Sequence, residues 1–582
     1  MVSSCGGESP APTNSFLSFL SHSWQSGTCD SDEASRFLRN YAAWELNAFL
    51  WISLIGITSL LTQKLFKLFN LWIQARRIPG PPCPSFYGHS SLLSRESLTD
   101  LLSDCHRRYG SVVKLWLGPT QLLVSIKDPE LIKEMLLKAK DKLPLTGKAF
   151  QLAFGQSSLF ASSFDKVRKR RDSLTNGLNG RLLEGTNVMP TKAMDCIMEK
   201  VQQIMRKGSV DCKMVSQHMA FTMLGATLFG DAFLDWSKAA LYEELLMMIA
   251  KDAFFWASYN VTPFWKQGFW RYQHLCTRLK SLTQDIVQQC RKNCKIFCCM
   301  NPSFNNQTVD SGMETTSGAP SCSSNVVQDN LSLQGLNDHL HAREEPCGNI
   351  MGVMFHGCLT TAGLINNMLA RLATHPEIQD KIHSEIMADK GSVKGDQHNV
   401  DTMPLLLATV YESARLLQAA PLLQRCSQEH DLRLVSGVII PAGTVLVVPV
   451  QLVQMEDSSW GNDAGEFNPY RFLSKTGKNS DSVQKSTLFE EGAEELLDHG
   501  GCSFVFNRPD ENAAFLPFGS GTRACIGQKF VIQAVATLFA SLLEQYEVKL
   551  LPGLETPSTT MKSSSVFQKF PSPEIVFVRR NT

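Results

Sequence analysis

The sequence has almost no net charge, because 56 lysines and arginines face 55 aspartates and glutamates across its 582 residues. The absence of a basic excess argues against nucleic acid, or any other bulk polyanion, as a main partner. The 17 cysteines are odd in number and irregularly spaced, which does not fit a disulfide framework and favours reduced thiols in a cytosolic setting. No internal repeat is visible. With 43% hydrophobic and 19% charged residues, the composition is that of a globular protein with a large core.

A secretory signal is also missing, since about forty polar residues precede the first apolar segment and no basic stretch adjoins it. That segment begins with AFLWISLIGITSLLT at residues 48–62, which carries no charge, and stays apolar to residue 73 past two lysines. Its length is sufficient to cross a bilayer. We therefore predict a polar tail at 1–45 and a membrane anchor helix at 46–75. The flanking positive charges predict a single-pass protein of the endoplasmic reticulum membrane with a cytosolic body.

The remainder of the chain has mostly helical patterns. Residues 76–90 begin with RRIPGPPCP, a proline density that excludes helix and predicts a stiff hinge before a catalytic domain at 91–582. Strand patterns follow the hinge and return at residues 432–450, where β-branched runs flank glycine and proline. Two polar stretches that are poor in aromatics, about 301–345 and 474–512, are predicted to be flexible surface insertions.

The clearest chemical signal lies in FLPFGSGTRACIG, residues 515–527, where Cys525 follows Arg523 in a glycine-rich loop. Glycine lets the backbone approach a large cofactor without a Cβ clash, and arginine can bind an anionic group of that cofactor. An apolar helix pattern follows, and its N-terminus favours an ionised thiol. A cysteine buried in a turn would need none of these neighbours. The spacing indicates a cysteine thiolate that holds haem iron.

The spacing from Phe518 through Gly521, Arg523 and Cys525 to Gly527 resembles the signature of the cytochrome P-450 haem-thiolate enzymes, of the eukaryotic microsomal type and with a plant-like form. In that family these positions form the cofactor-binding loop. Two further motifs, YESARL and FNPYRF, extend the resemblance, and smaller correspondences cover most of the chain from residue 79 onward.

The two further motifs supply Glu412, Arg415 and Arg471. Glu412 and Arg415 are three residues apart, which places them on one face of a helix. In the family the equivalent three charges form a buried network that locks the core around the haem. Such a network tolerates no missing member, because the remaining charge would be left buried and unpaired.

The resemblance implies a mainly α fold with a small β lobe and haem b (iron protoporphyrin IX) between two long helices. Cys525 is then the axial metal ligand, while Arg523, Arg425 and Arg168 are expected to bind the haem propionates. Phe164 stands where the family has tryptophan. The lost indole N–H would remove a hydrogen bond worth roughly 1 kcal/mol net, so haem binding should survive.

The main departure from the family lies in its oxygen-binding helix, where this chain has HGCLTT at residues 356–361. Thr360 keeps the hydroxyl that holds oxygen and a water, but Leu359 replaces the acid that relays protons. His356 replaces a small residue that faces the haem. It could relay protons, ligate the iron as a sixth ligand, or pack into the helix. A lone histidine on an apolar helix is usually a core residue, so packing is the expectation. Thr360 and His356 are the candidate catalytic residues.

The resemblance implies an oxidoreductase that inserts one atom of O2 into a lipophilic small molecule and sends the other to water. Electrons would come from NADPH through a membrane-bound flavoprotein reductase. The basic run at 166–171 is a candidate docking site for that reductase, with a solvated helix face as the alternative. Residues 254–272 are rich in aromatics and resemble the family's lid over the substrate channel.

Two other functions stay open. One is a haem-thiolate isomerase or dehydratase that acts on peroxides without a reductase, which Leu359 would suit because no proton relay is needed. The other is a non-catalytic haem- or ligand-binding protein in which His356 caps the iron.

Overall fold

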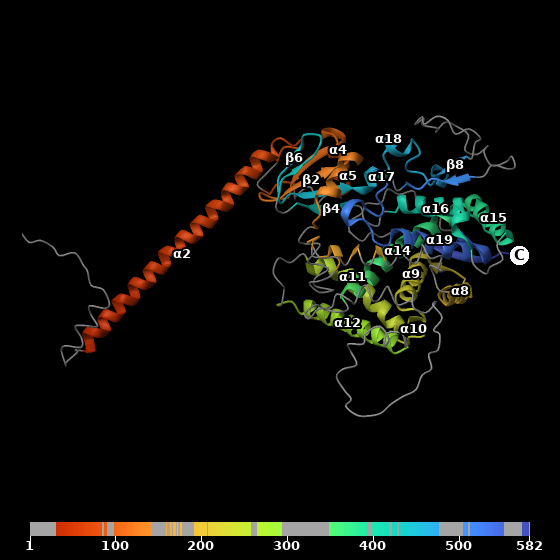
Figure 1. Cartoon of the computed structure of the whole chain (residues 1–582), viewed down its shortest axis with the longest axis horizontal. Helices are drawn as coiled ribbons and strands as arrows, with labels where there is room; N and C mark the ends of the chain where they lie inside the picture. Colours follow the sequence, from red (N-terminus) through yellow and green to blue (C-terminus); the bar gives the residue numbers. More distant parts are fainter. Residues whose placement is uncertain are drawn as a thin grey trace, which may run out of the picture. The chain divides into compact units, whose positions relative to one another are not determined.

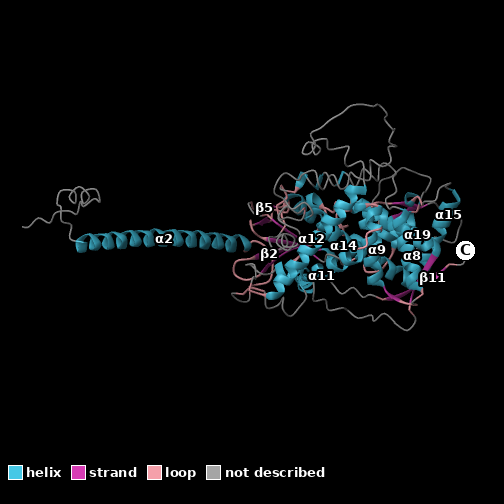
Figure 2. Cartoon of the chain, turned by 90° about the horizontal axis from the view of Figure 1, so that it is seen from below, coloured by secondary structure: helices cyan, strands magenta, loops and turns pink. Residues whose placement is uncertain are grey.

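Helices dominate the part of the chain that the structure describes, as Figures 1 and 2 show. The structure, a computed structural model, describes residues 31–83, 87–89, 98–142, 159, 163–165, 167–169, 171–172, 175–176, 191–206, 208–257, 265–293, 348–392, 398–417, 422–427, 430–475, 504–509, 512–551 and 573–580. Contacts divide the chain into two units, Met1–Gln74 and Ala75–Thr582. The prediction of a mainly α fold with a small share of strands is confirmed.

The first unit contains one long helix, α2 (Ser31–Ala75). Within its segment Phe37–Ala75, an 18-residue window has a mean hydropathy of 1.5 and no buried residue, and Trp51 is 65% exposed. An exposed apolar helix of this length makes a candidate membrane anchor. The helix begins well before residue 46, so residues 31–45, predicted as part of a polar tail, instead extend the helix.

The segment predicted as a hinge starts where α2 ends and packs onto the first strand, β1 (Val112–Trp116). The Lys114 N–H donates to the carbonyl of Pro79 at 2.8 Å, and its Nζ donates to the carbonyl of Ala75 at 2.7 Å. The lysine thus satisfies a carbonyl at the end of the helix that would otherwise lack a partner. These contacts fix the start of the proline-rich segment to the sheet.

The β lobe is a four-stranded sheet with the order β1-β2-β7-β4. Its other strands are β2 (Leu122–Ile126), β7 (Val445–Pro449) and β4 (Leu422–Cys426). Strands β2 and β7 are parallel and fully buried, which suits their β-branched and leucine side chains. Helix α4 (Leu98–Tyr109) covers the sheet through a cluster of buried apolar residues that includes Leu101, Leu102, Leu115, Leu123 and Val447.

The helical part is arranged around α14 (Gly348–Thr374), which packs against α9 (Cys212–Phe229), α16 (Pro404–Arg415), α12 (Gln267–Asn293) and α15 (Pro376–Ser392). A second long helix, α19 (Gln528–Gln545), packs against α15 and α16. The other elements are α5 (Pro129–Lys138), α8 (Thr191–Met205), β3 (Val210–Asp211), α10 (Asp231–Leu234), α11 (Ala239–Ala257), η3 (Val400–Thr402), β5 (Leu432–Arg433), β6 (Ile439–Ile440), α17 (Val450–Gln454), α18 (Asp457–Trp460), η4 (Pro469–Phe472), β8 (Leu473–Lys475), β9 (Phe504–Phe506), η7 (Gly521–Arg523), β10 (Tyr546–Leu550) and β11 (Glu574–Arg579).

Several predicted segments fall wholly or partly outside the described residues, among them both insertions and the aromatic stretch. The insertion at 301–345 lies outside them entirely, and so do residues 476–503 of the second insertion. The described ends of that second insertion form β8 and β9, which pair with each other. Of the aromatic stretch at 254–272, residues 258–264 lie outside, and α11 and α12 carry its two flanks.

Candidate cofactor site

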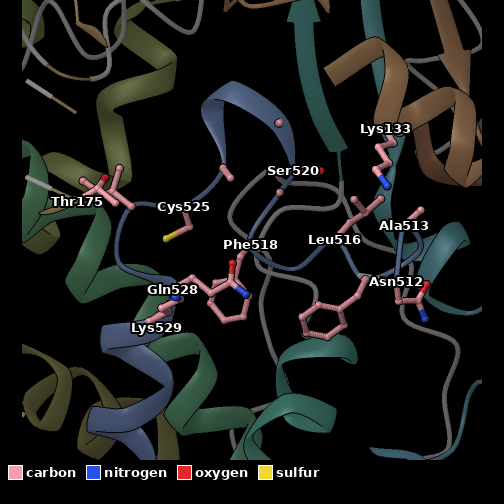
Figure 3. Close-up of a pocket in the computed structure, with 15 residues that line it drawn as sticks. Lys133, Thr175, Asn512, Ala513, Leu516, Phe518, Ser520, Cys525, Gln528 and Lys529 are labelled. Carbon is pink, nitrogen blue, oxygen red and sulfur yellow. The ribbon is translucent and has the colours of Figure 1, made fainter. Parts of the chain in front are cut away.

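The loop that carries Cys525 runs from η7 into α19, whose N-cap is Gly527. The Cys525 N–H donates to the carbonyl of Phe518 at 2.8 Å, which folds the loop back on itself. Burial raises the pKa of the Cys525 thiol, while the Gly527 N–H and the charge of Arg171 act in the opposite direction. Its side chain nevertheless keeps accessible surface, because it borders a cavity of about 350 Å³ (Figure 3).

Gly521 is the glycine of this loop whose conformation and surroundings both require glycine. Its φ is +70°, and a Cβ there would lie 2.5 Å from the carbonyl oxygen of Leu136 in α5. Gly519 has a φ of +69°, but the nearest atom to its Cβ would be 4.0 Å away. At Gly527 a Cβ would meet Val531 at an ordinary 3.9 Å. Gly521 thus allows a close approach of this loop to α5, while the predicted approach of the glycines to the cofactor stays a prediction.

Four cations gather beside this loop. Arg523 donates from Nε to the carbonyl of Lys140 at 3.0 Å, and Arg171 donates from Nη2 to the carbonyl of Ala524 at 2.6 Å. Arg425 comes from β4, and its neighbour Cys426 bonds the backbone of Asp141, which precedes Lys142, the fourth cation. The acceptors in the two arginine bonds are carbonyl oxygens, which satisfy the donors without neutralising their charge.

The cations disfavour one another's charged forms. Burial, and then the charges of Arg523 and Arg171, lower the pKa of Arg425 to about 10. Burial and the charge of Arg171 likewise lower the pKa of Arg523 to about 10, although Asp141 acts against them. The pKa of Lys142 falls to about 7 through burial and the three arginines. Among the described residues, Arg425 Nε is buried without a hydrogen-bond partner. This cluster fits a buried dianionic group such as the two propionates of haem.

Arg168, predicted as a propionate anchor, is not part of this cluster. Its side chain is 68% exposed and lies 4.0 Å from Asp172. Arg171, one helical turn later, takes the inward position. Phe164 is buried, and the Arg523 guanidinium lies 5.1 Å from the centre of its ring. The role of Arg168 stays a prediction, one that this exposed position does not support.

The three charges Glu412, Arg415 and Arg471 come together in the core. Arg415 donates hydrogen bonds to both carboxylate oxygens of Glu412, from Nε to Oε2 at 2.7 Å and from Nη2 to Oε1 at 2.8 Å. Arg471 Nε donates to Glu412 Oε1 at 3.1 Å. The side chains of Glu412 and Arg415 are fully buried. Backbone carbonyls, including those of Gln454 and Ala464, accept the remaining donors of Arg415, so the network is hydrogen-bonded as a buried charge requires.

One stripe of the central helix α14 is less buried than the rest of its surface. Its members recur every three or four residues: Asn349, Val353, His356, Thr360, Gly363 and Asn367. The C-terminal half of the stripe packs against α16 and the chain that follows it. Asn367 Nδ2 donates to the carbonyl of Ser413 in α16 at 2.7 Å, and Gly363 faces Leu417, just after the end of that helix. At Thr360 the side chain is exposed, although the helix is central.

His356 and Thr360 are adjacent on this stripe, and the Thr360 hydroxyl donates to the His356 carbonyl at 2.7 Å. Burial, and then the charge of Lys142, lower the pKa of His356 to about 3, so its imidazole is neutral at physiological pH. Its Nε2 is buried and its ring lies edge-on to Phe355, with 5.3 Å between the ring centres, so the expectation that His356 packs into the helix stays a prediction that this position supports. Leu359 flanks the stripe and supplies no titratable group.

Sequence reasoning missed three residues that complete these arrangements. Arg171 was visible only as part of a basic run, and Lys142 had no motif around it. Asp463 Oδ2 accepts a hydrogen bond from Arg471 at 3.0 Å and so joins the buried network. Burial raises the pKa of Asp463, but the hydrogen bond from Asn468 and then Arg471 outweigh it and lower that pKa. The sequence did place Asp463 a few residues before FNPYRF, which could have indicated a partner for Arg471. A lone acid in a loop is usually solvated, however, so it was not singled out.

Comparison with known proteins agrees with this geometry. The sequence model of a family described as Cytochrome P-450 matches residues 78–577. Cytochrome P-450 72A397 of Kalopanax septemlobus is 25% identical over 476 residues, which cover 78% of this chain and 79% of that protein. Human cytochrome P-450 4F11 is 23% identical over 525 residues, with 86% and 90% covered. Cytochrome P-450 734A1 of Arabidopsis thaliana is 25% identical over 529 residues, with 84% and 90% covered.

Proposed function

The chain belongs to the cytochrome P-450 family of haem-thiolate monooxygenases, and we propose that it is a membrane-anchored member that oxygenates a lipophilic small molecule with electrons from an NADPH-dependent reductase. The observation that carries this proposal is the accessible Cys525 beside a cluster of four cations, in which the charges of Arg171 and Arg523 lower the pKa values of Arg425 and Lys142. A thiolate and a cluster of buried cations are the two things that an iron porphyrin with two propionates requires of a protein.

Each part of the site has a distinct role in this reaction. Haem with an axial thiolate supplies the cleavage of the O–O bond when it is bound. Cys525 would be the metal ligand, held in place by its bond to Phe518 and by the approach of Gly521 to α5. Arg425, Arg523, Arg171 and Lys142 would hold the propionates. The buried Glu412 network keeps α16 and η4 together behind them.

Proton supply on the α14 side differs from the family pattern. Thr360 can hold a water through its hydroxyl, whose own hydrogen goes to the His356 carbonyl. Leu359 cannot relay a proton, and a histidine with a pKa of about 3 is a neutral imidazole at neutral pH, not an acid. Protons would therefore reach Thr360 through ordered water and not from an acidic side chain at these two positions. Leu359 is also the observation that favours the second candidate function, a peroxide isomerase or dehydratase that needs no such supply.

The reductase is proposed to approach the outer side of the cysteine loop. The cavity drawn in Figure 3 is lined by Lys133 of α5 and Lys529 of α19 as well as by Cys525. Both lysines are exposed, and so are Arg168 and Lys169 of the basic run. An acidic flavoprotein surface would be steered to such a patch. Two other members of that run, residues 166 and 170, lie outside the described residues.

The exposed apolar surface of α2 supports the proposed anchor in the endoplasmic reticulum membrane, with the catalytic unit in the cytosol. Thr58 and Thr62 would lie inside the bilayer, and their hydroxyls donate to carbonyls four residues earlier at 2.8 Å, so neither is left unsatisfied in lipid. Helix α14 is also apolar enough to span, but 61% of its apolar window is buried, which makes it a core helix. A membrane-bound enzyme meets substrates that partition into lipid.

The test is reconstitution of the full-length protein in vesicles with a panel of lipids. The carbon monoxide complex of the reduced protein should have the Soret band of a thiolate ligand, and Cys525→Ser should lose it. Turnover that needs both reductase and NADPH would support the monooxygenase. Turnover of hydroperoxides alone would support the isomerase, and a thiolate band without any turnover would support a binding protein.

A further inference from the structure

The last three turns of α2 differ in character from the turns before them. Residues 46–63 carry no charge, and these 18 residues measure about 27 Å along a helix that rises about 1.5 Å per residue. That length is about the hydrocarbon thickness of an endoplasmic reticulum membrane. The helix continues without a break to Ala75 (Figure 2), so its last 12 residues, 64–75, extend past the uncharged span.

These last turns have a polar side and an apolar side. Lys64, Lys67 and Asn70 follow one another every three residues and are exposed, so they form one stripe along the helix. The apolar residues on the other side recur at the spacing of helical turns: Leu65, Phe66, Leu68, Phe69, Trp72 and Ile73. Leu71 is the apolar side chain that falls on the polar side. The apolar side is open to its surroundings, since Phe69 is 63% exposed.

The charge of this segment has one sign. Lys64 and Lys67 are followed along the chain by Arg76 and Arg77, and all four are exposed. The sequence has no aspartate or glutamate from residue 46 to residue 95, so no acid close in sequence offsets these cations. A helix with an apolar side and a cationic side suits the surface of an anionic bilayer. Its apolar side chains enter the boundary between headgroups and acyl chains, and its lysines extend to the phosphates.

We propose that residues 64–77 bind anionic phospholipids of the cytosolic leaflet, with Lys64 and Lys67 on the headgroups and the apolar side of the helix among the upper acyl chains. The inference rests on the proposed anchoring by α2. Lipid headgroups are the occupant that the chain itself brings to these lysines, because the span before them ends in the same leaflet. The helix must then tilt, since the apolar side of these turns would stand in water if the helix were upright.

The experiment uses the full-length, haem-loaded protein in phosphatidylcholine vesicles with a trace of spin-labelled phosphatidylserine or spin-labelled phosphatidylcholine. Electron paramagnetic resonance measures how much of each lipid the protein immobilises, and the ratio gives its preference for anionic lipid. We expect Lys64→Gln/Lys67→Gln to lower this preference about fivefold or more, the effect of one cation near the surface. Lys64→Arg/Lys67→Arg should retain it. Lys200→Gln/Lys213→Gln removes the same charge from exposed positions of the catalytic unit and should behave like the wild type.

Equal immobilisation of the two lipids by the wild type would overturn the proposal. A preference that survives Lys64→Gln/Lys67→Gln, or that Lys200→Gln/Lys213→Gln reduces equally, would overturn it too. Should the first variant fail to insert, the salt dependence of the wild type decides. A preference that rests on exposed cations must vanish between about 0.01 and 1 M salt, as the Debye length falls from about 30 to about 3 Å, and one that persists rejects the proposal.

Two further measurements separate this inference from its alternatives. Alkaline carbonate extraction tests the anchor itself: release of the wild type from the vesicles rejects the anchor, whereas retention without a preference for phosphatidylserine rejects the lipid contact alone. Reductase-dependent turnover tests another occupant. If the wild type has no lipid preference but Lys64→Gln/Lys67→Gln loses this turnover, the segment binds the reductase and the lipid proposal is wrong.

Discussion

The guanidinium of Arg171 donates to the carbonyl of Ala524 at 2.6 Å, which ties the basic run directly to the residue before Cys525. The same arginine lowers the pKa of the Cys525 thiol against the effect of burial. Arg168, three residues earlier, points to solvent and pairs with Asp172. Two arginines of one helical turn thus have different environments, and they should have different effects on the cofactor.

We expect Arg171→Met to weaken haem retention roughly 10- to 100-fold, because a hydrogen bond from a charged group contributes about 1.5–3 kcal/mol. Arg168→Met is the matched control and should change haem retention by less than about threefold, as exposed pairs contribute about 0–1 kcal/mol. The measurement is the rate of haem transfer to an apo-globin acceptor. Equal effects of the two substitutions would show that the inward position of Arg171 has no bearing on the cofactor.

Much of the core arrangement could be predicted from local spacing. Glu412 and Arg415 are three residues apart on a helix, so their pairing follows from helix geometry, and the apolar pattern after Gly527 indicated α19. The mainly helical fold with a small sheet was predicted from the helical patterns along the chain and from the family resemblance.

Contacts between distant segments could not be predicted in this way. Which arginine of the basic run faces inward depends on the rotation of a helix turn, and motif spacing alone favoured Arg168. Lys142 reaches the site because the backbone of Asp141 bridges Cys426 in β4, a pairing that no short pattern encodes. The extension of α2 to Ser31 was missed because its first turns are polar.

The contact between Gly521 and Leu136 predicts a large difference between two alanine substitutions. Both Gly519→Ala and Gly521→Ala place a Cβ on a residue with positive φ, which costs roughly 1–2 kcal/mol. Gly521→Ala also drives its Cβ to 2.5 Å from the Leu136 carbonyl, so the loop must move away from α5. We expect Gly519→Ala to retain most of its thiolate-type carbon monoxide band and Gly521→Ala to lose it. Similar spectra for both variants would contradict the steric argument.

The buried network predicts that Glu412→Gln is strongly destabilising. Removal of the carboxylate charge leaves Arg415 and Arg471 buried without their shared partner, at a cost of about 3–5 kcal/mol. The control is Asp104→Asn, which removes an exposed pair with Arg107 at 3.4 Å and should change stability by less than about 1 kcal/mol. Thermal unfolding followed by haem absorbance would compare them. A small effect of Glu412→Gln would mean that the arginines find other partners.

His106 predicts a loss of stability in mild acid. Its Nδ1 lies 2.8 Å from the Gly110 carbonyl and its Nε2 lies 2.8 Å from Ser125 Oγ. Burial lowers the pKa of His106, the charge of Lys127 acts in the same direction, and the Gly110 bond and Glu456 act against both. The folded state therefore binds fewer protons than the unfolded state below about pH 6.5, the unfolded pKa. Stability is complete above that pH and falls as the pH drops, by at most about 1.4 kcal/mol per pH unit for one proton.

His106→Gln removes this titration while keeping an amide that can hydrogen-bond the same partners. We expect the urea midpoint of the wild type to fall more between pH 7.5 and 5.5 than that of the variant, even if the variant is slightly less stable at pH 7.5. His89 and His356 also have lowered pKa values, but they are present in both proteins, so the difference in slope isolates His106. His430→Gln, at an exposed position, should retain the wild-type slope. Parallel curves for the wild type and His106→Gln would show that this buried ring does not couple folding to protons.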